Sequence, residues 1–120
     1  MNEILNDIVR TGRVRASTGE QIENVTGITP AEGELLARLV REQRPRVSLE
    51  VGLAFGTSAL YLCDALAEVG ATRHHIIDPN QSTEWKGIGI ENLRRAGHAE
   101  LVELREKPSL VALPLSLIHI

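Results

Sequence analysis

The chain has 120 residues, of which 42% are hydrophobic and 24% are charged, and this size and balance predict a single globular domain. Only 2% of the residues are aromatic and the net charge is −3, so a nucleic-acid-binding surface, which needs basic charge and stacking side chains, is not expected. The sequence has no apolar run of roughly 18 residues and no signal-peptide pattern at its start, so we expect a cytoplasmic protein without a membrane partner.

The first third of the chain contains two predicted helices with a polar segment between them. Residues 4–9 carry apolar side chains at helical spacing, whereas residues 11–27 are polar and without a sustained period, which predicts a loop. A capping box then starts the second helix, with Thr29 as the N-cap and Glu32 three residues later. Pro45 ends this helix.

A strand, a glycine turn and a helix start follow as one unit. The largely apolar run Val47–Val51 predicts a buried strand, although Glu50 interrupts it. Gly52 and Gly56 lie in the turn, and the residues after it have the period of an amphipathic helix that ends at Gly70. Such a junction presents glycine main chain and helix N-terminal N–H groups to a small ligand.

The rest of the chain repeats this alternation. His74–Asp78 predicts a second strand, and the loop that begins at Pro79 leads to a predicted helix over residues 82–97. Glu100–Leu104 predicts a more exposed third strand, and a third crossover helix is expected to begin over residues 109–113. Helical crossovers between strands predict an α/β fold with a Rossmann-like parallel sheet.

Two glycines, Gly87 and Gly89, fall near the start of the predicted helix over residues 82–97. Glycine is a poor helix former, so we interpret this helix as loosened at its start.

Two acids end neighbouring predicted strands and therefore converge on the glycine turn. Glu50 would repel a pyrophosphate but could bind an amine, while the helix start at Thr57 and Ser58 could bind a carboxylate. Asp78 is placed to accept hydrogen bonds from ribose hydroxyls, or alternatively to cap the turn before Pro79. The glycine spacing is neither that of the dinucleotide fingerprint nor that of a Walker A loop. An amino acid joined to a ribose fits this pattern.

The segments Glu50–Ser58 and Ile76–Asp78 together resemble the class I S-adenosylmethionine-dependent methyltransferases, and Thr29–Leu36 is similar to the helix that precedes the first strand in their small-molecule O-methyltransferases. The resemblance covers residues 28–114. It implies that S-adenosyl-L-methionine is the cofactor, with Glu50 at its amine and Asp78 at its ribose. The full set of cofactor-binding residues that we expect is Glu50, Gly52, Leu53, Ala54, Gly56, Thr57, Ser58, Asp78 and Pro79.

The position of Ala54 departs from the family pattern, because many relatives have a third glycine there. The shape of the turn is therefore less certain from the sequence than its location.

The resemblance also divides the chain. Residues 1–28 are expected to form an N-terminal helix and loop, and residues 29–114 the N-terminal half of a methyltransferase domain, truncated after about three strands of the family's seven. Leu115–Ile120 resembles the translated end of a transposon used to prepare sequencing libraries, which predicts a non-native tail; a genuine apolar strand is the alternative. Such a half would expose a sheet edge prone to self-association and would not be expected to catalyse a reaction alone.

The function implied by the resemblance is transfer of a methyl group from the sulfonium to an oxygen, or less readily a nitrogen, of a small-molecule acceptor. The catalytic residues stay unassigned, and no metal site is predicted in this half. Two alternatives remain open: a half-domain of an NAD-dependent oxidoreductase and a non-catalytic binding module.

Other residues with reactive or aromatic side chains favour structural roles. Trp85 either covers the adenine, lines the acceptor pocket or simply packs in the core. His74 and His75 lie in a predicted strand and are read as structural, and His98 follows a helix end and is predicted to be solvated. Cys63 is predicted to be a buried, inert thiol.

Overall fold

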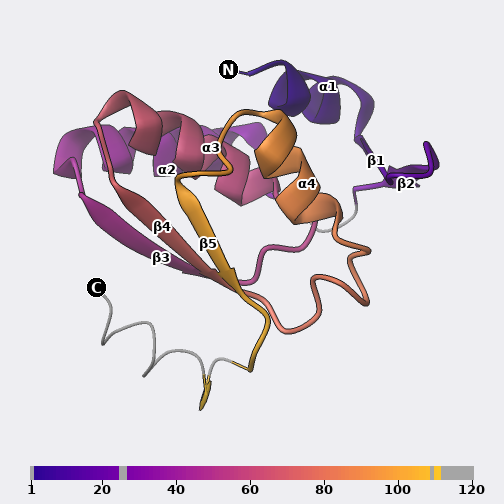
Figure 1. Cartoon of the computed structure of the whole chain (residues 1–120). Helices are drawn as coiled ribbons and strands as arrows, with labels where there is room; N and C mark the ends of the chain where they lie inside the picture. The colour runs from indigo at the N-terminus through magenta and orange to yellow at the C-terminus, as the bar shows by residue number, and fades with distance from the viewer. Residues whose placement is uncertain (1, 25–26, 109, 112–120) are drawn as a thin grey trace.

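The structure is a computed structural model, and it describes residues 2–24, 27–108 and 110–111 (Figure 1). A parallel sheet lies at its centre, with helices against it and a small hairpin at one end. The described elements are α1 (Glu3–Thr11), β1 (Arg13–Arg15), β2 (Gln21–Glu23), α2 (Pro30–Gln43), β3 (Val47–Val51), α3 (Thr57–Glu68), β4 (Arg73–Ile77), α4 (Ile88–Arg95) and β5 (Val102–Arg105).

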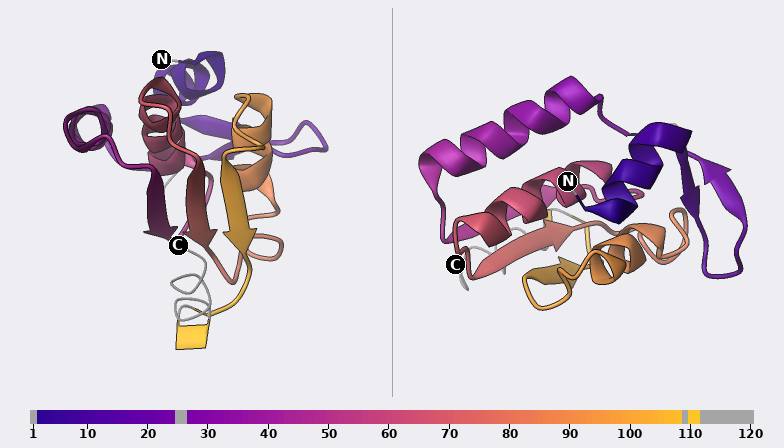
Figure 2. Two further views of the ribbon diagram at one scale, coloured as in Figure 1. Left: turned by 60° about the vertical axis from the view of Figure 1, so that its left-hand side comes forward. Right: turned by 90° about the horizontal axis from the view of Figure 1, so that it is seen from above.

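The central sheet has the strand order β3-β4-β5, and both pairings are parallel. Ser48 lies opposite His74 and Glu50 lies opposite Ile76 across the first pair. Both views in Figure 2 place α3 and α4 on the same side of this sheet, with α2 alongside α3. The predicted α/β parallel architecture is confirmed.

The capping box that starts α2 is present. The Thr29 hydroxyl accepts a hydrogen bond from the Glu32 backbone N–H at 3.2 Å, and the Thr29 backbone N–H donates to the Glu32 carboxylate at 3.0 Å. These bonds satisfy N–H groups that an α-helix leaves free at its start, which is why the helix begins at Pro30 as predicted.

The loop predicted over residues 11–27 is wrong in part, because β1 and β2 pair there as an antiparallel hairpin. Each strand has only three residues, too few to show a period of two in the sequence. What holds the hairpin in place is burial of one side: Val14 is 3% exposed and lies in the main core.

The helix predicted over residues 82–97 is also shorter than expected. Residues 79–87 form turns, and α4 begins only at Ile88, after Lys86 and Gly87 adopt left-handed backbone conformations. Left-handed residues cannot continue a right-handed helix, so the turns end there. The third strand, β5, lies one to two residues later than predicted. The predicted crossover helix over residues 109–113 falls mostly outside the described residues, and the predicted tail 115–120 falls wholly outside them.

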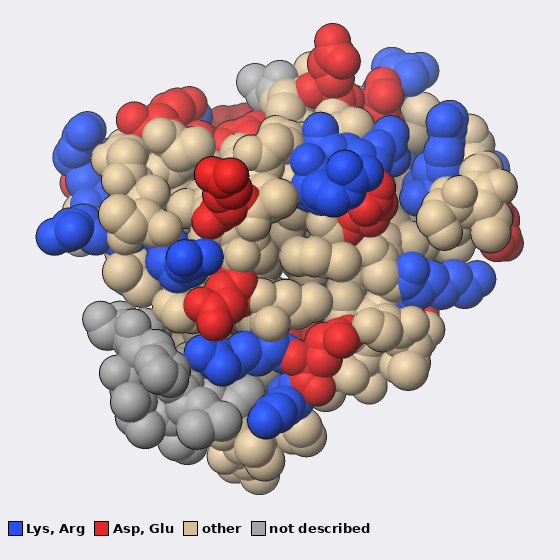
Figure 3. All heavy atoms as spheres, viewed as in Figure 1, with Lys and Arg blue, Asp and Glu red and all other residues tan. Residues whose placement is uncertain are grey.

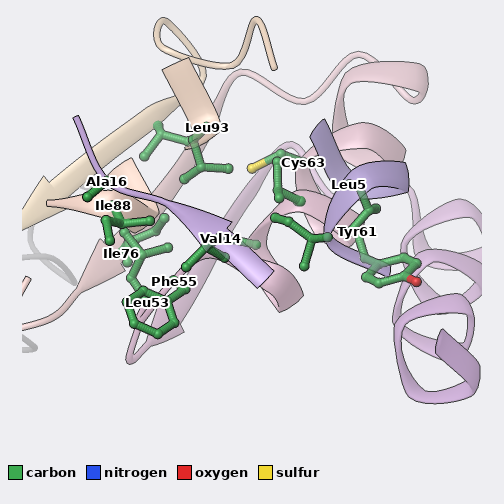
Figure 4. Packing of buried hydrophobic residues seen from close by; sticks show 14 residues of the cluster. Leu5, Val14, Ala16, Leu53, Phe55, Tyr61, Cys63, Ile76, Ile88 and Leu93 are labelled. Carbon is green, nitrogen blue, oxygen red and sulfur yellow. The ribbon is translucent and has the colours of Figure 1, made fainter. Parts of the chain in front are cut away.

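The main core is aliphatic, as the low aromatic content predicted, and it joins the hairpin to the sheet. Figure 4 shows Val14 and Ala16 lying among the side chains of Leu53, Phe55 and Ile88. The hairpin is thereby packed against the turn that follows β3. A second, smaller cluster fills the space between α2 and α3.

The prediction that His98 is solvated is wrong. Its side chain is buried and its Nε2 atom lies 2.7 Å from the Asp64 carboxylate. Burial by itself would raise the pKa of Asp64, but hydrogen bonds from His98 and Asn2 outweigh this effect and lower the pKa. This pair ties α3 to the segment after α4.

Within the part of the chain that the structure describes, no helix is long and apolar enough to span a membrane.

Candidate functional site

The turn between β3 and α3 has a backbone path that depends on left-handed residues. Gly52, Ala54 and Gly56 have φ angles of 85°, 49° and 92°. Alanine in this region costs about 1–2 kcal/mol, so Ala54 adds backbone strain that a glycine would not. No atom lies within 4 Å of the point where a Cβ on Gly52 would sit. The main chain of Gly52 is therefore open to direct approach by a ligand.

Asp78 fixes the shape of this turn. Its Oδ2 atom accepts hydrogen bonds from the backbone N–H groups of Leu53 and Ala54, both at 3.0 Å, and its Oδ1 atom accepts one from the N–H of Asn80, also at 3.0 Å. The side chain is buried. Asp78 thus caps the turn before Pro79, which was the alternative interpretation. Oδ2 also accepts a hydrogen bond from the Gln81 side-chain amide at 3.3 Å, whereas among the described residues Oδ1 accepts only the one from Asn80 and keeps a lone pair for a ligand hydroxyl.

A hollow of about 440 Å³ lies at the carboxyl ends of β3 and β4. Four of the predicted site residues line it, namely Gly52, Ala54, Asp78 and Pro79. Its other lining residues are Val51, Ile77, Asn80, Trp85 and Pro108. Ligands of parallel α/β sheets bind at this end of the strands.

Trp85 lines the hollow, and its ring packs against that of Phe55. The two rings meet edge to face with their centroids 5.1 Å apart. Trp85 therefore packs against Phe55 and also lines the hollow, so a packing role and a contact with a ligand are compatible for this residue.

Glu50 and Ser58, also predicted site residues, do not line the hollow but contact each other. The Ser58 hydroxyl donates to Oε2 of Glu50 at 2.5 Å, and the Nε2 atom of His74 lies 3.1 Å from Oε1. The Glu50 side chain is 12% exposed, so it is reachable from one side only.

The remaining predicted residues are buried in the turn and the helix start. Leu53 and Thr57 are buried, and the Thr57 hydroxyl accepts a hydrogen bond from the Asn24 side-chain amide at 2.8 Å. Gly56 precedes α3 and gives it no side-chain cap, so the first N–H groups of α3 have no capping side chain. Free N–H groups at a helix start carry partial positive charge and suit a carboxylate.

Three residues support the turn from the segment before α4 and from α4 itself, and this role was not predicted from the sequence. The buried Gln81 donates to the Ala54 carbonyl at 2.9 Å and accepts from the Ile90 N–H at 3.0 Å, and Asn92 donates to the Phe55 carbonyl at 3.0 Å. At Gly89 a Cβ would lie only 2.3 Å from the Ala54 carbonyl oxygen. Nothing in the local pattern marks these roles, because the contacts join segments that are distant in the chain.

Residues 3–116 match the O-methyltransferase family. The chain belongs to the O-methyltransferase family. A search of curated proteins gave no match.

Solved structures of methyltransferases share the fold. An O-methyltransferase from Bacillus cereus in complex with S-adenosylhomocysteine is 23% identical, with a TM-score of 0.73, and the alignment covers 98% of this chain and 49% of that one. An O-methyltransferase from Streptomyces achromogenes, involved in tomaymycin synthesis and solved with S-adenosylmethionine, is 26% identical over 96% of this chain and 47% of that one, also with a TM-score of 0.73.

A third structure, a methyltransferase from Podospora anserina bound to S-adenosylhomocysteine, is 19% identical, with a TM-score of 0.73, over 96% of this chain and 46% of that chain. The chain thus spans about half the length of the structures it matches. The predicted Rossmann-like methyltransferase fold is confirmed, and the family assignment displaces the oxidoreductase alternative. Among the described residues, no group of three or more His, Cys, Asp or Glu side chains is arranged to hold a metal ion.

Proposed function

We propose that the chain forms the cofactor-binding half of an S-adenosyl-L-methionine-dependent methyltransferase that acts on an oxygen of a small molecule. The observation that carries this proposal is the open main chain at Gly52, together with the partly buried Glu50 on β3 and the buried Asp78 directly after β4, in a member of the O-methyltransferase family. When bound, the cofactor supplies the electrophilic methyl group on its sulfonium.

The residues of this chain bind and orient the cofactor. Glu50 provides negative charge for the amine, and the free N–H groups at the start of α3 provide donors for the carboxylate. The glycine turn lets the cofactor lie on main chain, and Asp78 holds that turn in place and offers an acceptor for the ribose. Trp85 forms an apolar wall that excludes water from one side.

The net effect of these groups is alignment of the methyl donor. Holding a reacting group in one orientation removes much of the entropic barrier of a two-molecule reaction. A general base for the acceptor hydroxyl is not assigned to any residue of this chain. The solved relatives carry S-adenosylmethionine or S-adenosylhomocysteine, and one of them takes part in tomaymycin synthesis, which supports the cofactor and a small-molecule acceptor.

Calorimetric titration with S-adenosylhomocysteine tests this proposal in the protein expressed from its complete gene. We expect binding with the unchanged sequence, weaker binding with Asp78→Ala because the turn loses two hydrogen bonds, and unchanged binding with Asp7→Ala at an exposed position of α1. NAD serves as the competing ligand. Absence of S-adenosylhomocysteine binding, or binding that Asp78→Ala does not alter, would contradict the proposal.

We further infer that the chain by itself associates through the free edge of β3. This strand is at the edge of the described sheet, and its last residue, Val51, is 58% exposed. Leu35 and Leu39 of α2, the helix that precedes β3 in the chain, are exposed as well. Sedimentation of the 120-residue chain should show concentration-dependent association, which a Val51→Lys change should reduce; a monomer at all concentrations would refute it. A cytoplasmic location is part of the same proposal.

A further inference from the structure

A chain of buried hydrogen bonds runs across β3 and β4 and ends at Glu50. The Ser48 hydroxyl lies 2.7 Å from Nδ1 of His74, and Nε2 of His74 lies 3.1 Å from Oε1 of Glu50. The Ser58 hydroxyl then donates to the other oxygen of the same carboxylate. His74 is 1% exposed, so water has little access to its ring nitrogens.

The register of the sheet explains why these side chains meet. Ser48 and Glu50 are two residues apart on β3 and so point to the same face of the sheet. His74 lies opposite Ser48 on β4, and its side chain points to that face as well. His75, the next residue, points to the opposite face.

The chemistry of the three groups sets the direction of the bonds. A carboxylate can only accept, so Nε2 of His74 carries the proton and donates to Glu50. In the neutral ring Nδ1 is then an acceptor, and Ser48 donates to it. Glu50 therefore sets the tautomer, Ser48 fixes the tilt of the imidazole, and the imidazole fixes one oxygen of Glu50.

We propose that His74, anchored by Ser48, is a positioning residue that orients the Glu50 carboxylate toward the amine of the cofactor. This inference rests on the proposed function, in which Glu50 binds that amine. Two of the roughly four acceptor sites of the carboxylate are used by His74 and Ser58, and the others remain for an ammonium group. Without His74, only the Ser58 hydroxyl would hold the Glu50 carboxylate, and its other oxygen would be free to turn toward solvent.

The test compares two ligands that differ in the amino-acid part, which includes the amine that Glu50 would bind. S-adenosylhomocysteine carries the amino-acid part, whereas 5′-methylthioadenosine keeps the adenosine and thioether and lacks it. Calorimetry on the protein expressed from its complete gene measures both affinities. The quantity compared is the affinity for S-adenosylhomocysteine divided by the affinity for 5′-methylthioadenosine. A role in orienting Glu50 lowers this ratio, whereas general loosening of the sheet weakens both ligands equally and leaves it unchanged.

The expected results separate His74 from its neighbours. His74→Leu should lower the ratio about tenfold, in the direction of Glu50→Gln, because a hydrogen bond to a charged group is lost. His74→Gln should largely restore the ratio, since its amide can donate to Glu50. His75→Leu, a change of the adjacent buried histidine on the opposite face, should leave the ratio unchanged.

Ser48→Ala keeps the test decisive where His74→Leu does not fold. It removes only the anchor of the ring and should lower the ratio about threefold. An unchanged ratio in both His74→Leu and Ser48→Ala, alongside a reduced ratio in Glu50→Gln, would overturn the role of His74 and leave the proposed function standing. An unchanged ratio in Glu50→Gln, or no binding of S-adenosylhomocysteine at all, would overturn the proposed function as well.

Discussion

Gly89 is the point at which α4 touches the glycine turn, and the substitution Gly89→Ala tests how closely the two must approach. A methyl group at this position would lie 2.3 Å from the Ala54 carbonyl oxygen and 2.8 Å from Cγ of Leu53. Ordinary contact begins at 3.4 Å, so helix and turn would have to separate by about 1 Å. The carbonyl is backbone and cannot rotate away as a side chain would.

The expected cost follows from two opposing effects. Overpacking costs about 1–3 kcal/mol, and a contact with backbone belongs at the upper end of that range. Replacing a helical glycine by alanine returns about 1 kcal/mol of helix propensity. We therefore expect the free energy of unfolding to fall by about 2 kcal/mol, and the displaced turn to bind S-adenosylhomocysteine at least about tenfold more weakly.

Gly87→Ala is the matched control. Gly87 has a φ angle of 68° and no atom within 4 Å of its Cβ position, so alanine there costs about 1–2 kcal/mol of backbone strain without pushing on the turn. Urea unfolding and calorimetry on the protein expressed from its complete gene measure both quantities. The two variants should lose similar stability, and only Gly89→Ala should lose affinity. Wild-type affinity in Gly89→Ala would refute the claim that this contact shapes the cofactor site.

Three further predictions concern stability and reactivity. Thr29→Ala should lower the free energy of unfolding by about 1 kcal/mol because it removes the capping box, and Thr29→Ser should not; equal urea midpoints for the two would contradict this. Burial lowers the pKa of His75, and nearby positive charges lower it further, while Glu103 acts in the opposite direction. As the pH falls, His75 therefore takes up a proton in the unfolded chain before it does so in the folded chain. Stability should therefore fall as the pH drops below about 6.5, and His75→Gln should flatten this dependence in urea titrations at several pH values; an equally steep dependence in the variant would exclude His75 as the source. Burial, with the charges of nearby carboxylates, raises the pKa of the Cys63 thiol far above its usual value, so iodoacetamide at pH 8 should label Cys63 only after unfolding, and rapid labelling of the native protein would be inconsistent with the buried position.

The surface charge is mixed, in agreement with the small net charge of the sequence. Figure 3 shows acidic and basic side chains interspersed over the visible face, with no broad field of one sign. Several of these charges are paired, as Arg41 is with Glu68 and Arg94 with Glu91. Exposed pairs of this kind contribute little to stability, so the fold depends mainly on its aliphatic core.

Predictions that depended on local chemistry were confirmed. The start of α2 at Pro30 follows from the capping box, and the bounds of β3 and the helix α3 follow from their apolar patterns. These signals lie within a few residues of the element that they specify, so no distant contact can easily reverse them. The expected burial of β3 is wrong: it is at the edge of the described sheet, where its first four residues are half-buried and Val51 is exposed.

Predictions failed where the deciding contact was distant in the chain. The hairpin of β1 and β2 exists because Val14 reaches a core built by β4, α3 and α4, and three-residue strands have no period of their own. His98 was predicted to be solvated because it follows a helix end, but Asp64 on α3 holds it in a buried position. Gly89 was interpreted as a weak point in a helix, whereas it permits the approach of α4 to the turn.

From α2 onward, the sequence by itself determined the order of helices and strands, the location of the glycine turn, and the acids Glu50 near the end of β3 and Asp78 directly after β4, because capping, periodicity and glycine spacing are local properties. Only the tertiary structure decided what those acids contact. It directs Asp78 onto the N–H groups of Leu53 and Ala54, and it places His74 against Glu50. The reason is the register between parallel strands, which sets side-chain neighbours across the sheet and has no signature in either strand alone.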